Sequence, residues 1–258
     1  SRGLGDVYKR QAIQEEDSQN GLAHFLEHMM FNRTKNFPDN SMSRWLESIG
    51  MQFGTNLNAA TGMEMTYYQL TQVPLKREGI IDSMLLILHD WSGFLSLGEK
   101  EIDKERGVIV EELRQRNNAA WRIGNKAAPY VYGDTRYASR NMLGTEEFLR
   151  TFEPDTLRGF YKRWYRPDLQ AIVIAGDFDV NMMEAKLKKV MTDIPKRENT
   201  MRKEIVSIPN NREPVIAIIS DPEQQGCKAN FYIKRAVVPK ELNNRVAVSY
   251  THLRAHET

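Results

Sequence analysis

The sequence of 258 residues contains almost no cysteine and no long apolar run. Its one cysteine, Cys227, excludes an internal disulfide and any metal site built from several cysteines. No apolar stretch approaches the roughly 20 residues that a membrane-spanning helix needs, so the sequence indicates no membrane span.

An excess of charge of one sign is also missing. Lys and Arg number 36 against 34 Asp and Glu, which leaves a formal net charge of +2. Neither nucleic acid nor an anionic membrane is therefore expected as the main partner. The length and the hydrophobic content of 41% suffice for one large domain, or for one domain and part of another.

The two ends of the chain differ from the rest. "SRGLGDVYKRQ" at the start and "SYTHLRAHET" at the finish resemble translated sequencing-adapter read-through at the ends of environmental gene fragments. We therefore expect residues 1–11 and 249–258 to be non-native and to take no part in the fold. We therefore also expect the native protein to extend further at both ends. The lack of a visible signal peptide then excludes no compartment. His252 and His256 lie in the terminal segment and are not expected to be metal ligands.

The stretch "GLAHFLEHMMF", residues 21–31, places ionisable side chains in apolar surroundings. On a helix over about residues 21–32, His24 and His28 point the same way, with Cβ atoms roughly 5–6 Å apart. Two imidazoles at this spacing can bind one zinc ion, and Glu27 can take a proton from a water on that ion. The order H-x-x-E-H is the inverzincin pattern.

A five-residue pattern also arises by chance, with two ordinary helix histidines and a surface glutamate. The flanking residues argue against this alternative, because the helix is apolar around the motif and would place the polar side chains against protein. These flanking residues are Leu22, Phe25, Leu26, Met29 and Met30.

A catalytic zinc ion normally has three protein ligands, so a third must come from elsewhere. Residues 103–116, "DKERGVIVEELRQR", predict a glutamate-rich helix. Glu105 and Glu112 share one face of this helix, whereas Glu111 points about 100° away from Glu112. One carboxylate could bind zinc and another could hold a ligand histidine by its second nitrogen. A solvated surface helix is the alternative, and the pattern alone does not choose between them.

Three motifs occur in this order along the chain: "GLAHFLEHMMFNRTKNFPDN", "GTNLNAATGMEMTYYQL" and "ERGVIVEEL". Together they resemble the pitrilysin or insulinase family of zinc peptidases, M16, which includes the mitochondrial processing peptidases. The similarity covers about residues 12–245 and is greatest to the large bacterial periplasmic type. It implies an α+β fold in which helices pack on a sheet.

The resemblance also implies the roles of individual residues. His24, His28 and Glu112 would be the zinc ligands, Glu27 the general base, and Glu105 a support for the site. One zinc ion per catalytic domain is the implied cofactor.

The segment "FGTNLNAATGMEMTYYQL" is rich in β-formers in its second part. It predicts an edge hairpin, and the resemblance implies an edge strand beside the zinc that pairs with the substrate backbone. Asn58 and Ala59 match the family's Asn-Ala pair and are the implied substrate-binding residues. Arg33 departs from the family's usual glycine, and we expect only a local change of backbone there.

The resemblance divides the chain into three parts. Residues 12–198 would form the N-terminal catalytic domain, residues 199–213 a linker, and residues 214–248 the truncated start of a second, similar domain. Two strands around a turn are expected after Pro214. The run "LQAIVIAGDF" predicts a buried strand. Helices are expected at "DSMLLILHDWSGF", "PDTLRGFYKRWY" and "VNMMEAKLKKVMTDI". His89, in the first of these segments, is expected to be a core or interface histidine.

The implied function is zinc-dependent endopeptidase activity on peptides or unfolded polypeptide segments. The expected partners are the substrate and the missing C-terminal half of the same chain, and the expected location is the periplasm. A non-catalytic binding or assembly subunit, an inactive fragment, and an unrelated hydrolase or metal-binding module are the alternatives.

Overall fold

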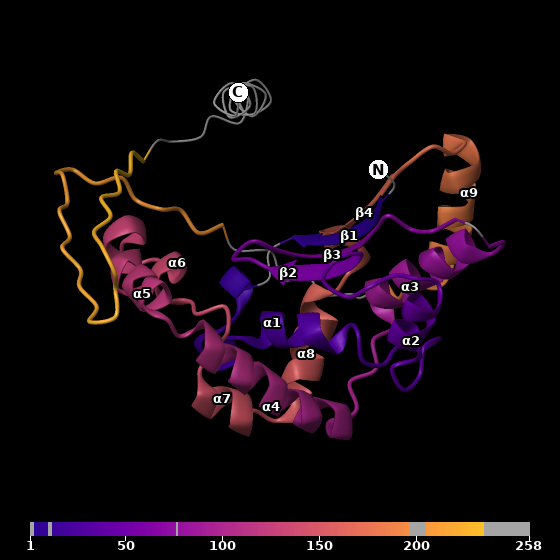
Figure 1. The fold of residues 1–258 in the computed structure, drawn as a ribbon, viewed down its shortest axis with the longest axis horizontal. Coiled ribbons are helices and arrows are strands. Elements are labelled where there is room, and N and C mark those ends of the chain that lie inside the picture. The colour runs from indigo at the N-terminus through magenta and orange to yellow at the C-terminus, as the bar shows by residue number, and fades with distance from the viewer. Residues whose placement is uncertain (1–2, 10–11, 76, 197–204, 235–258) are drawn as a thin grey trace.

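The computed structural model describes residues 3–9, 12–75, 77–196 and 205–234. Its fold is α+β, with helices packed against one antiparallel four-stranded sheet (Figure 1). In spatial order the strands are β2 (Leu57–Thr61), β3 (Met65–Thr71), β1 (Gly3–Lys9) and β4 (Gln170–Ala175). The sheet therefore joins segments from both ends of residues 3–175.

Strand β1 corrects the expectation that residues 1–11 stay outside the fold. Val7 pairs with Tyr67 of β3 on one side and with Ala171 of β4 on the other, so β1 lies inside the sheet. Ladder hydrogen bonds join backbone groups, so a segment without an apolar period can still fill the space between two strands. Residues 249–258 lie outside the described residues.

Strand β4 was expected to be buried, and this prediction was wrong. It is the outer strand beyond β1, and Val173 keeps 58% of its surface exposed. A run of β-branched residues predicts a strand, but it does not distinguish a central strand from an outer one.

The helices are α1 (Leu22–Met29), α2 (Ser41–Ser48), α3 (Ile80–Gly93), α4 (Glu99–Arg116), α5 (Ala119–Tyr132), α6 (Arg136–Ser139), α7 (Glu146–Thr151), α8 (Pro154–Trp164) and α9 (Val180–Val190). Short 3₁₀ turns occupy Ala12–Gln14, Asp17–Gln19, Pro167–Leu169 and Met191–Asp193. The five helices expected from the sequence are confirmed as α1, α3, α4, α8 and α9. Helices α1 and α8 lie along one face of the sheet, and α4 lies on the far side of α1 (Figure 1). No helix in the described part of the chain is long and apolar enough to cross a membrane.

Large aromatic side chains fix α1 between the sheet and the helices. Trp91 of α3 and Tyr68 of β3 are fully buried, with ring centroids 5.4 Å apart. The Trp91 indole donates a hydrogen bond to the backbone oxygen of Met30 at 3.0 Å, directly after α1. The core therefore holds the C-terminal end of the helix that carries the histidines.

A buried carboxylate fixes the other end of α1. Glu15 is fully buried and accepts hydrogen bonds from the backbone N–H groups of Gly21 at 2.9 Å and Ala23 at 2.8 Å. Gly21 has φ +104°, and a Cβ there would lie 2.7 Å from the Cα of Gly144. The start of α1 thus requires glycine, and two of the N–H groups there are satisfied by one side chain.

Residues 205–234 contain no helix or strand, so the two strands expected after Pro214 are absent from this part of the structure. The segment is attached to α5, where the Arg122 guanidinium donates hydrogen bonds to both oxygens of Asp221 at 2.7 and 2.6 Å. Several apolar side chains of this segment are uncovered, among them Ile216 and Ile218, which are 86% and 95% exposed. Ile219 is half-buried.

Candidate metal centre

Helix α1 brings the two histidines of the motif together. His24 is buried, with 6% of its surface exposed, and His28 is half-buried. Their ring centroids are 4.7 Å apart in an edge-to-face arrangement. This is the geometry that four-residue spacing on a helix predicts.

Helix α4 supplies a carboxylate to the same point. The Oε2 atom of Glu112 lies 3.1 Å from Nε2 of His28 and 3.6 Å from Nε2 of His24. Its Oε1 atom lies 2.6 Å from Nη2 of Arg116, one turn later on α4. The side chain of Glu111 is 58% exposed and lies 3.8 Å from Arg114. Glu112, and not Glu111, is therefore the carboxylate of this centre.

The three side chains suit a zinc ion. Their possible ligand atoms all lie within 4.8 Å of one another. Two ligand atoms about 2.0–2.2 Å from a tetrahedral zinc ion lie roughly 3.3–3.6 Å apart, so the spacing to Glu112 needs only a small adjustment. Two histidines and one glutamate are also a donor set typical of catalytic zinc.

Glu105 holds His28 from the side opposite Glu112. Its Oε1 atom lies 2.9 Å from Nδ1 of His28, and its Oε2 atom accepts a hydrogen bond from Nδ2 of Asn32 at 2.9 Å. This contact fixes the ring and leaves Nε2 directed at Glu112. Glu105 thus lies where the sequence resemblance implied a supporting carboxylate.

Burial and neighbouring charge shift the pKa values of the centre. Burial, together with the positive charge of His28, lowers the pKa of His24 to about 4, so its ring is neutral near pH 7. Burial also tends to lower the pKa of His28. The hydrogen bonds of His28 with Glu105 and Glu112 outweigh burial and raise this pKa to about 9. The hydrogen bond from His28 holds the pKa of Glu112 at about 2, so that carboxylate is ionised.

Glu27 lies beside these groups on α1 and contacts the sheet. Its Oε2 atom accepts a hydrogen bond from the hydroxyl of Thr61 at 2.5 Å. Burial raises the pKa of Glu27, while the Thr61 hydrogen bond and the charge of His28 act in the opposite direction. A partly buried carboxylate with a raised pKa is suited to accepting and returning a proton.

Asn58 and Ala59 lie on β2, the outer strand on the side of the sheet that contacts α1. Both residues are half-buried. The segment "TYYQL", which the sequence placed in an edge hairpin, forms β3 and lies between β2 and β1. Within this hairpin the outer edge is therefore β2, because β1 covers the other side of β3.

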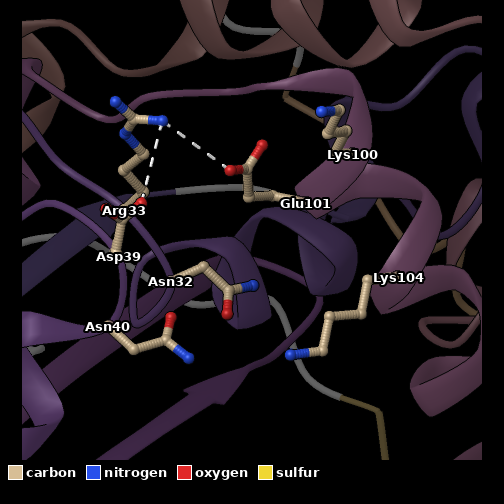
Figure 2. A pocket seen from close by; sticks show the side chains of 7 residues that line it. All are labelled: Asn32, Arg33, Asp39, Asn40, Lys100, Glu101 and Lys104. Atoms are coloured by element: carbon tan, nitrogen blue, oxygen red, sulfur yellow. Dashed lines mark ion pairs between the residues drawn. The ribbon is translucent and has the colours of Figure 1, made fainter.

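An open pocket of about 260 Å³ is lined by none of the three candidate ligands, although one of its lining residues, Asn32, contacts Glu105 (Figure 2). The Arg33 guanidinium lies 3.8 Å from Glu101 and 4.0 Å from Asp39 across this pocket. Its lining residues are Asn32, Arg33, Asp39, Asn40, Lys100, Glu101 and Lys104. Arg33 thus forms surface ion pairs, and the three candidate ligands still converge.

Comparison with protein families gives two matches. The insulinase family, peptidase family M16, matches residues 12–135, and the M16 inactive domain matches residues 151–243. The chain belongs to peptidase family M16. The M16 assignment agrees with the convergence of the motif residues described above.

Individual M16 proteins are similar along most of the chain. The probable zinc protease PqqL of Escherichia coli (strain K12) is 35% identical over 219 residues, which cover 80% of this chain and 23% of that protein. The crystal structure of the first half of the periplasmic protease PqqL from Escherichia coli has a TM-score of 0.75 at 32% identity. The matched region covers 81% of this chain and 44% of the chain in that crystal structure. Pitrilysin, with a TM-score of 0.65 at 20% identity over 80% of this chain and 22% of its own, shares the fold. The chain spans about a quarter of the full-length PqqL protein that it matches.

Three residues of the centre were missed by the sequence analysis: Asn32, Thr61 and Arg116. Arg116 follows Glu112 by four residues, so helical spacing could have identified it. Asn32 directly follows the motif helix, but its hydrogen bond to Glu105 crosses to α4. Thr61 is 34 residues from Glu27, and only the packing of β2 on α1 brings them together.

Proposed function

We propose that this chain carries the catalytic zinc site of an M16 endopeptidase. The observation that carries the proposal is the convergence of His24, His28 and Glu112 on one point, with Glu27 beside them. His24 and His28 would bind zinc through Nε2 and Glu112 through Oε2, with one ion in the catalytic domain. Glu105 would support His28.

Zinc at this position would supply a Lewis acid that polarises water and the scissile carbonyl. Glu27 would take one proton from the attacking water, whose oxygen forms the new bond to the carbonyl carbon. When the C–N bond breaks, Glu27 would pass that proton to the leaving nitrogen, which yields a carboxylic acid and an amine.

The substrate would be a peptide or an unfolded polypeptide segment. Strand β2 is an outer strand, and an extended peptide can add to such an edge through backbone hydrogen bonds. Asn58 and Ala59 on β2 would contact the substrate next to the metal centre. No nucleic acid is expected among the partners.

The chain would act as one part of a longer protease. We retain residues 12–198 as the catalytic domain, to which the structure adds strand β1, with 199–213 as a linker and 214–248 as the start of a second domain. The C-terminal half of the same protein would then be its partner and close the substrate site. The protein named PqqL in Escherichia coli is described as periplasmic, which supports the same location here.

Glu27→Gln in the full-length protein that contains this chain tests the mechanism. We expect peptide hydrolysis to fall about 10²–10⁴-fold, because the proton acceptor is lost. Zinc content measured on the same preparation should remain at one equivalent, because the three ligands are unchanged. Glu47→Gln, an exposed glutamate on α2, is the matched control and should retain activity.

Each alternative has its own outcome. Failure of the unaltered protein to bind one equivalent of zinc would remove the metallopeptidase proposal. Zinc binding and peptide binding without hydrolysis would favour a non-catalytic subunit. Full activity of Glu27→Gln would show that another group accepts the proton.

A further inference from the structure

Strand β2 ends on a residue that contacts the proposed general base. Thr61 is the last residue of β2, and its hydroxyl lies 2.5 Å from Oε2 of Glu27 on α1. Elements α1 and β2 pack against each other, so this hydrogen bond joins the motif helix to the outer strand.

The direction of the hydrogen bonds follows from the chemistry of the groups. An ionised carboxylate only accepts, so the Thr61 hydroxyl donates its one hydrogen to Glu27. Its oxygen can then accept from the hydroxyl of Thr66, which lies 3.3 Å away on β3 and is fully buried. Thr61 and Thr66 are directly paired across the two strands. The short chain of hydroxyls therefore contacts Glu27 through Oε2.

The turn between β2 and β3 fixes Thr61 in this place. The backbone N–H of Gly62 donates to the backbone oxygen of Met65 at 2.7 Å, and the Tyr137 hydroxyl of α6 contacts Glu64 at the tip of the hairpin. The hydroxyl of Thr61 is therefore held against Glu27 by the sheet and by a second helix.

We propose that Thr61 is a positioning residue that orients the carboxylate of Glu27 and couples it to the outer strand β2. The inference rests on the proposed function. A substrate that pairs with β2 would then be placed in fixed register with the group that accepts the proton. Thr61 itself would touch neither the zinc ion nor the reacting atoms.

The test compares Thr61→Val, Thr61→Ser and Thr71→Val in the full-length protein. Valine keeps the shape and removes the hydroxyl, so we expect kcat to fall about 10–100-fold, the effect of one hydrogen bond to a charged group. KM should stay near its original value, and serine should restore kcat to within about threefold. Thr71 lies in the same hairpin, and its hydroxyl donates to the backbone oxygens of Thr55 and Asn56 and not to Glu27. Thr71→Val should therefore leave kcat unchanged.

Two further measurements separate positioning from a structural role. Zinc content and zinc affinity of Thr61→Val should equal those of the original protein, because no ligand is altered. In a Glu27→Gln background, Thr61→Val should cause no further loss of the residual rate, because the two changes act through one group.

The inference would be overturned by an unchanged kcat in Thr61→Val, by weakened zinc binding in that variant, or by serine failing to restore the rate. Failure of the proposed function has a different result. Glu27→Gln would then keep full activity, or the original protein would bind no zinc.

Discussion

The Nδ1 atom of His28 lies 2.9 Å from Oε1 of Glu105, on the opposite side of the ring from Glu112. The second oxygen of Glu105 accepts a hydrogen bond from Asn32. The orientation of the His28 ring is thus determined by α4 as well as by α1. A histidine oriented in this way presents a fixed nitrogen to a metal ion and does not have to be ordered on binding.

Replacing Glu105 should weaken zinc binding without abolishing it. Glu105→Ala frees the His28 ring and lowers its basicity, so we expect zinc affinity to fall about 10–100-fold. Chelator competition on the full-length protein that contains this chain measures this change. Asn32→Ala removes only the outer hydrogen bond and should cause a smaller loss. Equal zinc affinity in Glu105→Ala and the original chain would contradict the supporting role.

Substitution should show which of the two adjacent glutamates, Glu111 or Glu112, is the third zinc ligand. Glu112→Ala in the full-length protein removes a ligand and should leave substoichiometric zinc after gel filtration, because two histidines alone bind zinc weakly. Glu111→Ala is the matched control, since that side chain is 58% exposed and lies beside Arg114. We expect it to keep one equivalent of zinc by metal analysis. Loss of zinc in Glu111→Ala, with retention in Glu112→Ala, would reverse the assignment.

The sequence predicted the local part of the centre better than the part that depends on tertiary contacts. The spacing of His24 and His28 on one helix is a local property, and the structure brings both rings together as expected. Helical geometry alone did not decide which of Glu105, Glu111 and Glu112 is the third ligand, because the approach of α4 to α1 is a long-range contact. The family resemblance, and not the spacing, singled out Glu112.

The strands were predicted less well for a related physical reason. A β-strand is stabilised by its neighbours, and side-chain pattern does not reveal which backbone groups will find partners. Residues 3–9 pair on both sides in spite of a sequence without an apolar period. Residues 215–219, "VIAII", have strong β propensity and form no strand within the described segment.

Stability should depend on pH through Glu15. Burial raises the pKa of Glu15 to about 8, although the N–H groups of Gly21 and Ala23 and the charge of Arg140 act in the opposite direction. The folded chain then binds a proton that the unfolded chain releases above about pH 4.5. This contribution to the free energy of unfolding is present below pH 4.5 and is lost as pH rises towards 8, with a slope of up to about 1.4 kcal/mol per pH unit.

Urea unfolding of Glu15→Gln between pH 5 and 8 tests this dependence. The amide cannot ionise, so the variant should lack the part of the pH slope that Glu15 contributes. Glu16→Gln is the neighbouring control, because Glu16 is 55% exposed and pairs with Arg163. It should keep the pH slope of the original chain. The same slope in the original chain and in Glu15→Gln would mean that Glu15 stays ionised in the fold.

The exposed apolar side chains of residues 205–234 should limit the solubility of residues 1–258 expressed alone. Ile216, Ile218 and Phe231 are 86%, 95% and 98% exposed in a segment without helix or strand. Exposed apolar surface of this kind drives self-association. We therefore expect residues 1–258 to be poorly soluble and to hydrolyse a quenched peptide slowly or not at all, even with added zinc.

Charge substitution identifies the cause of that association. The triple variant Ile216→Lys, Ile218→Lys and Phe231→Lys should shift the chain from aggregates to a monodisperse species in light scattering, because it removes the apolar surface. The control triple variant Asn210→Lys, Gln225→Lys and Asn230→Lys adds the same charge at exposed polar positions of the same segment and leaves the apolar side chains in place. Equal improvement by both variants would indicate that net charge, and not the apolar surface of this segment, governs solubility. A monodisperse original chain with rapid, chelator-sensitive turnover would show instead that residues 1–258 already suffice for activity.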